Sequence, residues 1–451
     1  IAVATPPTTP TPVALPDSSI ASDNVIVVDY LYYDGFGQTN RVAVKALADA
    51  FNEAQDSIEV RVGTNFSGSY ITDAADNYDC FAWSGWASSY AASPEFVAKF
   101  YSLTPLIATE DASFFEDFHN EHLTWNQVEG ELYALPIAVQ PYVIQYNVDL
   151  LASLGLEPPT LDSSLEDFWA LATAVTHSTG DRDIYGFVPS ILMPENLPLL
   201  VPGATYPYDL YSSPPTASFT DPAVIQSMAW LADMVAENVM FPVDWGGSRT
   251  TDEHPNYGSL QMQQQSSLIR LGKAAMWVTS ANQGDYPFDT GVVPFPQTQL
   301  LPRLSLTPNL TSLYISRRTS NPSGCWEWLK FLSAQPNIFL GIPARQSVVE
   351  SPGWVETVGA EVAAAYQIAV TRPIQPLPDL TDPYLGATYP YSIWWADALH
   401  GVFAGDSPVD VLTEMQLRAD VYLGCLTTSV SINPEQITAC AREADPELQS
   451  P

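Results

Sequence analysis

The sequence contains few positive charges. Its 451 residues include 16 lysines and arginines against 51 aspartates and glutamates, which gives a formal net charge of −35. Such a chain repels nucleic acid and anionic membrane surfaces, so we expect neither as a partner. The acidic composition favours solubility in a salty or acidic environment.

Uninterrupted apolar runs are also missing. No run of about 20 apolar residues occurs, so the sequence predicts no transmembrane helix. It begins at Ile1 rather than at methionine and has no signal-like apolar core, which is typical of a product matured by signal removal. We therefore expect an extracellular or cell-surface protein on the periplasmic side.

Motifs of catalysis and of metal binding are absent as well. The sequence has no G-x-S-x-G, no H-E-x-x-H and no glycine-rich phosphate loop. Asp181-Arg182-Asp183 lacks the frame of a calcium loop, and without C-x-x-C the five scattered histidines predict no zinc site. We therefore expect no enzyme, no cofactor and no metal.

Four cysteines are candidates for disulfides. Cys425 and Cys440 flank a short polar loop near the C-terminus, and Cys80 and Cys325 would pair if both lie in one lobe. The sequence leaves the connectivity open. An even number of cysteines suits an oxidising, extracytoplasmic compartment.

Apolar residues are plentiful enough for a packed core. Hydrophobic residues make up 46% and aromatic residues 12% of the chain, whose length fits three domains of about 150 residues or two lobes of about 200. Residues 1–24 form a Pro/Thr-rich arm that favours an extended, polyproline-like tether. A strand at 25–28, a helix at 41–52 and a strand at 58–62 then predict an α/β lobe with a mostly parallel sheet.

The segment GELYALPIAVQPYVIQYNVDL, residues 130–150, predicts a crossing between two lobes. Its first apolar run, Leu132–Leu135, is broken by Pro136, and a second β-rich run covers Val143–Tyr146. Gly291–Pro296 is a strand stopped by prolines and the candidate for a second crossing.

Helix signals complete the pattern. Ser164 followed by Asp167 predicts a capped helix start. Trp326 and Trp328 fall on a helix with the spacing of core residues, so we assign both to structure. Later helices are predicted at about 354–368, 391–404 and 408–423.

Seven motifs occur in an order that resembles a known family. They are Asp79–Trp83, Gly130–Leu150, Gly155–Pro159 with Glu166–Phe168, Gly272–Met276, Gly291–Pro296, Trp326–Leu332 and Ile393–Ala396. Together they span about residues 25–424 and resemble the bacterial extracellular solute-binding proteins of sugar ABC transporters, above all the maltose-binding type. The chain departs from the family pattern in its N-terminal arm, its Cys425–Cys440 tail, Cys80 in place of an apolar residue, and Gln140 in place of an acidic hinge residue.

The resemblance implies an α/β, two-lobe periplasmic-binding-protein-like fold of type II, with hinge segments and a cleft between the lobes. Lobe 1 would hold residues 25–138 and 304–340, and lobe 2 residues 139–303 and 341–450. The implied function is capture of a neutral oligosaccharide or related polyol and its delivery to the membrane subunits of an ABC transporter.

The resemblance also supplies candidate ligand-binding residues. Sugars present apolar C–H faces edged with hydroxyls, which aromatic rings and hydrogen-bonding side chains recognise. The first candidates are Trp83, Trp86, Gln140, Tyr142, Asn282 and Trp394. The second candidates are Tyr33, Trp245, Trp277, Arg345 and Trp395. For any single tryptophan, burial in a lobe core is an equal alternative.

Two other functions stay open at this point. The arm at residues 1–24 would allow strand addition to a neighbouring subunit, which would make the protein a self-assembling extracellular filament or array that reuses the fold. The other is a glycan-active enzyme, which no motif predicts. Loss of association on deletion of residues 1–24 would support the first, and hydrolysis of an oligosaccharide the second.

Overall fold

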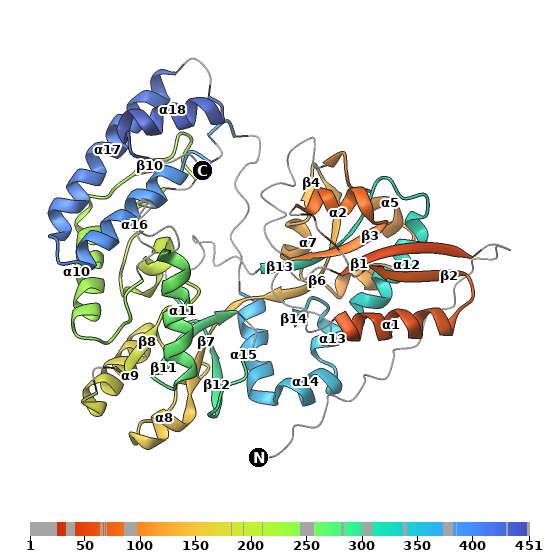
Figure 1. Cartoon of the computed structure of the whole chain (residues 1–451), viewed down its shortest axis with the longest axis horizontal. Coiled ribbons are helices and arrows are strands. Elements are labelled where there is room, and N and C mark those ends of the chain that lie inside the picture. Colours follow the sequence, from red (N-terminus) through yellow and green to blue (C-terminus); the bar gives the residue numbers. More distant parts are fainter. Residues whose placement is uncertain are drawn as a thin grey trace. The chain divides into compact units, whose positions relative to one another are not determined.

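The computed structural model of the protein divides into two compact units (Figure 1). The first unit comprises Ile1–Pro141 and Pro308–Arg372, and the second comprises Tyr142–Thr307 and Pro373–Pro451. The structure describes residues 25–32, 41–63, 66, 68, 70–84, 97–181, 183–192, 194–209, 211–243, 257–280, 284–298, 300, 309–336, 341–372, 382–384, 386–429 and 432–448.

The observed boundaries differ from all three predicted ones, because the chain passes between the units at 141–142, 307–308 and 372–373. Residues 139–141 and 341–372 belong to the first unit rather than to the second, because β14 (Ile342–Pro343) pairs with β6 (Ala134–Gln140) in the first sheet. Gly291–Pro296 was expected to cross between lobes. Its strand β12 (Thr290–Pro294) instead pairs inside the second unit, and the return to the first unit falls at 307–308.

The described strands of the first unit include a six-stranded sheet in the order β14-β6-β13-β3-β1-β2, and a separate pair of β4 (Gln127–Val128) and β5 (Glu131–Leu132). The remaining four strands of the sheet are β1 (Ile26–Tyr32), β2 (Ile58–Gly63), β3 (Cys80–Ser84) and β13 (Asn309–Ile315). β1 pairs in parallel with both β2 and β3, as the strand-helix-strand pattern predicted. β13 runs antiparallel to both β3 and β6, and β14 antiparallel to β6, so the sheet is mixed and the expected mostly parallel sheet was wrong.

Pro136 does not end its strand, contrary to the prediction. β6 continues through it to Gln140 and pairs with β13, whose register shifts between Thr311 and Ser312. The shift leaves Ile137 as the extra residue of a bulge, because Ser312 pairs with Pro136 and Thr311 with Ala138. Proline has no N–H to donate to a ladder, and a bulge is one of the few places where a paired strand tolerates it.

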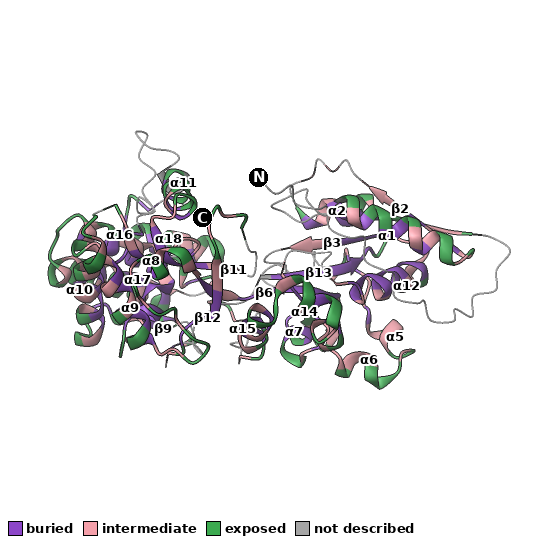
Figure 2. Ribbon diagram, turned by 90° about the horizontal axis from the view of Figure 1, so that it is seen from below, coloured by how far each residue is buried: buried purple, intermediate pink, exposed green. Residues whose placement is uncertain are grey.

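Helices cover both faces of the first sheet (Figure 1). On one face lie α1 (Arg41–Ala54) and α12 (Pro322–Ser333), where Trp328 of α12 packs edge-on against Tyr30 and Phe51. α2 (Ile71–Asn77) lies on the other face, against Leu31, Phe81 and Tyr314. Figure 2 shows how much of α12 is buried, and Trp326 and Trp328 are buried as predicted.

A disulfide joins α12 to the sheet. Cys80 on β3 and Cys325 on α12 are bonded, with their Cα atoms 6.0 Å apart. Side chains alternate between the two faces of a strand, so Cys80 and Phe81 point to opposite faces of β3. The disulfide therefore lies on the face covered by α12, and Phe81 lies on the face covered by α2.

Short elements complete the first unit. They are α5 (Thr104–Ile107), α6 (Ala112–Glu116), α7 (Asn120–Thr124), β4 (Gln127–Val128), β5 (Glu131–Leu132), α13 (Gln346–Val349), α14 (Pro352–Val358) and α15 (Ala360–Val370). The helix predicted at about 354–368 is therefore two helices. Gly359, with φ 88°, separates them, because that conformation cannot continue a helix.

The described strands of the second unit include a four-stranded sheet in the order β12-β7-β11-β8. Its strands besides β12 are β7 (Tyr142–Asn147), β11 (Ala274–Ser280) and β8 (Tyr185–Val188). β7 lies antiparallel between β12 and β11. The pair β9 (Tyr208–Asp209) and β10 (Thr216–Ala217) forms a separate two-stranded ribbon.

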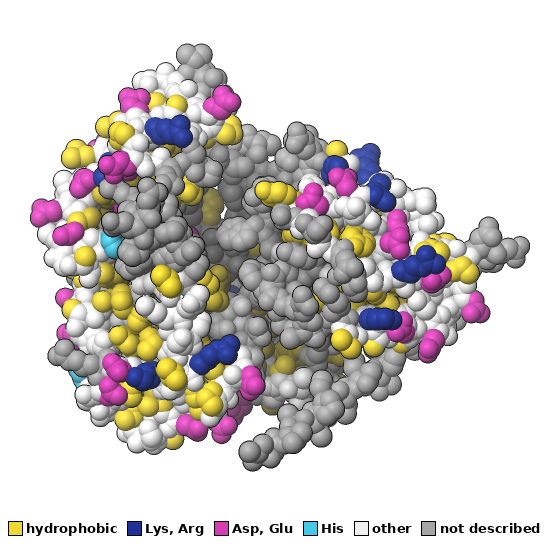
Figure 3. Space-filling view, in the orientation of Figure 1, with side chains coloured by type: hydrophobic (Ala, Val, Ile, Leu, Met, Phe, Trp, Pro, Cys, Tyr) yellow, Lys and Arg dark blue, Asp and Glu magenta, His cyan; other side chains and the backbone are white. Residues whose placement is uncertain are grey.

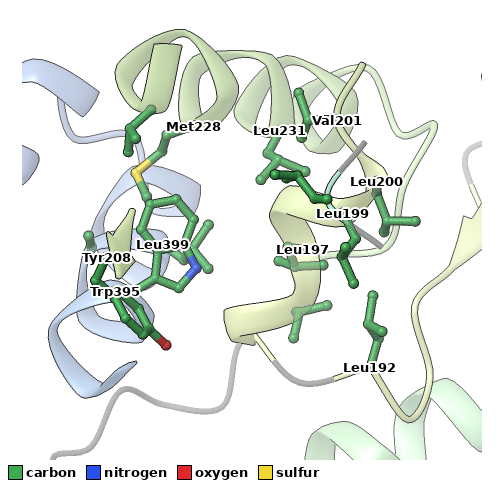
Figure 4. Packing of buried hydrophobic residues seen from close by; sticks show 14 of the residues in the cluster. Leu192, Leu197, Leu199, Leu200, Val201, Tyr208, Met228, Leu231, Trp395 and Leu399 are labelled. Carbon is green, nitrogen blue, oxygen red and sulfur yellow. The ribbon is translucent and has the colours of Figure 1, made fainter. Parts of the chain in front are cut away.

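The described helices of the second unit are α8 (Val148–Ser153), α9 (Leu165–Thr179), the 3-10 helix η1 (Pro194–Leu200), α10 (Pro222–Ala236), α11 (Tyr257–Arg270), α16 (Tyr389–Phe403), α17 (Pro408–Thr428) and α18 (Pro434–Ala444). All of them except α8 and α11 contribute buried residues to one large apolar cluster. Ser164 caps α9 in a reciprocal box with Asp167, as predicted. Figure 4 shows side chains of η1, α10 and α16 meeting in the cluster.

The last three helices are fastened to one another. Asp445, after α18, accepts hydrogen bonds from Trp394 Nε1 of α16 at 3.1 Å and from Arg418 Nη1 of α17 at 2.7 Å. Cys425 of α17 and Cys440 of α18 form the second disulfide, with Cα atoms 5.5 Å apart. These contacts fix a helical layer of which the sequence predicted α16 and α17; α18 was missed, because the segment between Cys425 and Cys440 was expected to be a short polar loop.

On the face shown in Figure 3, several basic side chains lie beside acidic ones. Among the ion pairs of the described residues, Lys99 lies 2.6 Å from Asp76 and Lys273 lies 2.9 Å from Asp183, and both pairs are partly exposed to solvent. Exposed pairs of this kind contribute little to stability. Among the described residues, no helix has the length and apolar character needed to cross a membrane.

One buried histidine stands out in the first unit. His122 of α7 is 1% exposed, and neither ring nitrogen has a hydrogen-bond partner among the described residues. The ring of His119 lies 5.3 Å away. Burial, with a smaller effect from His119, lowers the pKa of His122 from 6.5 to about 3.

We expect His122 to make the fold acid-sensitive. Its folded-state pKa lies below the unfolded value, so the stability kept by the neutral ring is present above pH 6.5 and is lost as the pH falls towards about 3. Between these two pH values, the free energy of unfolding falls by about 1.4 kcal/mol for each unit by which the pH is lowered. His122→Phe should flatten the pH dependence of the unfolding free energy, measured by urea denaturation. The same exchange at exposed His177 should not, and equal slopes in the two variants would contradict this account.

Candidate ligand-binding site

The first unit gathers candidate residues at one end of its sheet. β3 and β6 reach their carboxyl ends where the antiparallel β13 begins, since Ser84 pairs with Thr311 and Gln140 with Asn309. We call Phe66, Trp83, Ser84, Gln140 and Thr311 the first-unit edge. Its two hydroxyls are linked, with Ser84 Oγ 2.6 Å from Thr311 Oγ1.

Trp83 is the aromatic member of this edge. It is half-buried and meets the ring of Phe66 edge-on at 6.1 Å, above the cluster around Phe81. Strand alternation places Trp83 on the same face as Phe81 but one step nearer the strand end. The ring is therefore anchored on one side by the core and remains partly exposed.

Gln140 is the polar member at the end of β6, and it is half-buried. Gly341 approaches it closely, because a Cβ at that position would lie 2.7 Å from Val139 O and 2.8 Å from Gln140 Cγ. Gly341 also has φ 118°, so only glycine fits there without strain. The backbone beside Gln140 is thus tightly defined.

The second unit gathers candidates at the end of its own sheet. Tyr142 begins β7 and pairs with Ser280, the last residue of β11, while Val143 pairs with Pro294 at the end of β12. η1 follows the carboxyl end of β8. We call Tyr142, Glu195, Tyr206, Thr279 and Ser280 the second-unit edge.

Glu195 is a half-buried carboxylate that sequence reasoning missed. Burial raises its pKa, and no cation among the described residues forms an ion pair with it. The pKa of Tyr142 is raised chiefly by the burial of its own ring, and the negative charge of Glu195 raises it further. The signal was present in the sequence, since Glu195 is the one acidic residue in the apolar run ILMPENLPLL after β8.

Tyrosines surround this carboxylate. Burial first, and the charge of Glu195 among smaller effects, raise the pKa of Tyr206 and Tyr208. Tyr206 donates its hydroxyl hydrogen to Tyr208 Oη at 3.2 Å, and the two rings are 4.7 Å apart. The second-unit edge therefore combines ring faces, hydroxyls and one carboxylate.

Three predicted tryptophans lie in the core of the second unit rather than at this edge. Trp394 and Trp395 are 0% exposed and Trp277 is 1% exposed. Each indole N–H has an intramolecular acceptor, namely Asp445 for Trp394, the Pro194 carbonyl for Trp395 and Gln145 for Trp277. Packing accounts for all three, and Trp395 holds the backbone next to Glu195.

Arg345 also has a structural environment. Its Nε lies 2.6 Å from Asp117 Oδ2, and its guanidinium sits 5.2 Å from the ring centre of Phe114. Asp117 further accepts hydrogen bonds from the backbone and hydroxyl of Ser347. The arginine thus ties α13 to the loop after α6. The predicted residues Tyr33, Trp86, Trp245 and Asn282 lie outside the described residues.

The chemistry of the two edges is that of recognition. Both offer aromatic rings beside neutral hydrogen-bonding groups, which suits polyhydroxylated ligands. Among the described residues, no group of three or more histidine, cysteine, aspartate or glutamate side chains could hold a metal ion.

Comparison with protein families gives the decisive observation. The family model for bacterial extracellular solute-binding proteins matches residues 37–337. The chain belongs to the bacterial extracellular solute-binding protein family. A comparison with curated proteins gave no match.

Solved structures of similar proteins agree with this family assignment. The GacH receptor of Streptomyces glaucescens, solved free and with acarbose, has a TM-score of 0.60 at 18% identity, covering 90% of this chain and 100% of its own. The substrate-binding protein Lmo0181 of Listeria monocytogenes, solved with cycloalternan, has a TM-score of 0.59 at 16% identity. The match covers 89% of this chain and 100% of Lmo0181. UgpB of Mycobacterium tuberculosis, solved with glycerophosphocholine, has a TM-score of 0.59 at 15% identity. The match covers 90% of this chain and 100% of UgpB.

At these identities the likeness shows the fold alone. It confirms the α/β, two-lobe, maltose-binding-like fold of the solute-binding family that the sequence motifs predicted. The three bound ligands are those of the other proteins, and they differ in chemistry, so the fold does not fix the ligand.

We expect Glu195→Gln to stabilise the protein at neutral pH. Because burial raises the pKa of Glu195, its contribution to stability is present below the unfolded pKa of about 4.5 and is lost as the pH rises through the folded value. The variant should therefore be more stable than the wild type at pH 7 and equal to it at pH 4 in thermal unfolding. Glu157→Gln, at an exposed loop position, should show no such difference. A wild type more stable than Glu195→Gln at pH 7 would refute the assignment.

Proposed function

We propose that this solute-binding protein captures a neutral oligosaccharide or a related polyol and delivers it to the membrane subunits of an ABC transporter. The observation that carries the proposal is the composition of the two strand edges. Trp83 and Gln140 lie on one edge and Tyr142 and Glu195 on the other, and Gln140 and Tyr142 are separated in sequence only by Pro141.

The chemistry of these groups favours neutral ligands. The ring of Trp83 can stack on the C–H face of a sugar, and Gln140, Tyr142 and Glu195 can bond its hydroxyls. A formal net charge of −35 and the carboxylate of Glu195 disfavour anionic ligands. Proteins of similar fold that were solved with cycloalternan and with acarbose support the same class.

The proposed ligand-binding set is therefore Trp83, Gln140, Tyr142 and Glu195. Trp86, Asn282, Tyr33 and Trp245 stay predictions of the family resemblance, since they lie outside the described residues. We leave out Trp277, Trp394, Trp395 and Arg345, because intramolecular contacts account for these four.

The proposal includes a location and a mode of action. The protein would act on the extracellular or periplasmic side as a receptor without catalysis of its own, as the family description suggests. Self-assembly through the arm at 1–24 stays a prediction, because the arm lies outside the described residues.

A thermal-shift screen against maltotriose, cellotriose and xylotriose, with light-scattering mass in parallel, tests the function. A ligand at 100 times its dissociation constant should stabilise the protein by about 2.7 kcal/mol. A shift at monomeric mass is the expected result. No shift with any of the three, together with a polymeric mass, would overturn the proposal.

Trp83→Ala should weaken binding of the sugar that gives the largest shift by about tenfold, which corresponds to about 1.4 kcal/mol, because the stacking surface is lost. Isothermal titration calorimetry measures the change. Trp328→Phe is the control, since Trp328 is a buried core residue of the same unit. It should lower stability and leave affinity unchanged. Equal affinity of Trp83→Ala and the wild type would remove Trp83 from the site.

A further inference from the structure

Glu195 carries a charge for which the described part of the chain supplies no counter-ion. The residue is half-buried, and none of the ion pairs among the described residues includes it. Burial raises its pKa, and a hydrogen bond from its own backbone N–H offsets part of that effect. A carboxylate removed from water is costly unless a cation or several hydrogen-bond donors face it. We therefore looked at what surrounds this carboxylate.

The backbone at Glu195 is held in place from the core. Trp395 Nε1 donates to the carbonyl oxygen of Pro194, the preceding residue, at 3.0 Å. Leu197 and Leu199 of the same helix η1 are fully buried in the large apolar cluster of the second unit (Figure 4). The carboxylate therefore extends from a packed helix and has a defined position.

Three tyrosines of the second unit lie within electrostatic reach of this carboxylate. Burial is the largest cause of the raised pKa of Tyr142, Tyr206 and Tyr208, and the negative charge of Glu195 raises each of them further. Tyr142 and Tyr206 are half-buried and pack against the same apolar cluster. The Tyr206 hydroxyl donates to Tyr208 Oη at 3.2 Å, and among the described residues no tyrosine hydroxyl donates to Glu195. The carboxylate thus lies near aromatic rings whose hydroxyls do not neutralise it.

The charges of the protein favour a cation at this place. Lys273 lies 2.9 Å from Asp183 and Arg418 lies 2.7 Å from Asp445, so these two cations of the second unit are engaged elsewhere. A formal net charge of −35 attracts cationic ligands to the protein. An ammonium group forms a charge-assisted hydrogen bond with a carboxylate and is attracted to the face of a tyrosine ring. A sugar hydroxyl can also donate to Glu195, but it brings no charge.

We propose that the second-unit edge binds an amino-substituted ring of an oligosaccharide, with the ammonium group on the Glu195 carboxylate and beside the rings of Tyr142 and Tyr206. The inference rests on the proposed function and departs from its neutral ligands at this one ring. The ligand supplies the counter-charge that the described chain does not. The site then selects the amino sugar over its neutral counterpart, and the discrimination comes from one carboxylate.

Calorimetric titration with matched ligands tests the proposal. The ligands are whichever of maltotriose, cellotriose and xylotriose gives the largest thermal shift, its 2-amino-2-deoxy derivative, and the N-acetylated form of that derivative. At pH 7 the wild type should bind the amino derivative about tenfold more tightly than the parent sugar, because the ammonium group adds a charge-assisted hydrogen bond. The acetylated form keeps the nitrogen without its charge and should show no such gain.

Variants assign the preference to particular side chains. Glu195→Gln keeps the size of the side chain without its charge, and it should bind the parent sugar and the amino derivative with equal affinity. Glu157→Gln removes a charge from an exposed loop position of the same unit and should keep the tenfold preference. Tyr142→Phe, which keeps the ring, should also keep it, whereas Tyr142→Leu should reduce it.

The outcomes separate this inference from the proposed function. A wild type that binds the parent sugar as tightly as the amino derivative, or a preference that survives in Glu195→Gln, would overturn the inference and leave the proposed function standing. A wild type that binds none of the three parent sugars and none of their amino derivatives would overturn both.

Discussion

The continuous segment from Ala134 to Asn147 is the constraint on which both candidate edges depend. Its first half, β6, is paired on both sides in the first sheet, and its second half, β7, is paired on both sides in the second. Only Pro141 separates them. Because ladders hold each strand in register, the side chains at its inner ends, Gln140 and Tyr142, have defined backbone positions. A slip of one residue in either strand would send these side chains to the opposite face of the sheet.

The two units stabilise their edges in different ways. In the first, the Cys80–Cys325 bond fastens α12 to β3, the strand that carries Trp83, and Trp328 of α12 packs against Tyr30 of β1 and Phe51 of α1. In the second, Trp395 holds η1 through the Pro194 carbonyl, and so supports the turn that presents Glu195. Core tryptophans thus fix the backbone from which the half-buried groups of the two edges extend.

Buried polar groups divide into satisfied and unsatisfied ones. Asp445 accepts bonds from Trp394 and Arg418, and Gln145 bridges Trp277 and Thr290, so these groups specify packing. His122 and Gln265 have no hydrogen-bond partner among the described residues and lie in different units. Unsatisfied groups cost stability, and the protonation of His122 gives the fold a response to acid.

The sequence by itself determined the α/β class, the family, the capped start of α9 and the core roles of Trp326 and Trp328. Local periodicity, capping chemistry and motif order carry that information. Tertiary structure decided what depends on pairing between distant segments. Pro136 stays in a strand because β6 bulges at Ile137 beside it, and residues 341–372 join the first unit because Ile342 pairs with Val139. Tertiary structure also decided that Trp83 is half-buried and that Trp394 is fully buried. The sequence does not show this difference, because only the residues packed around an indole decide whether its face is open to a ligand or covered by a core.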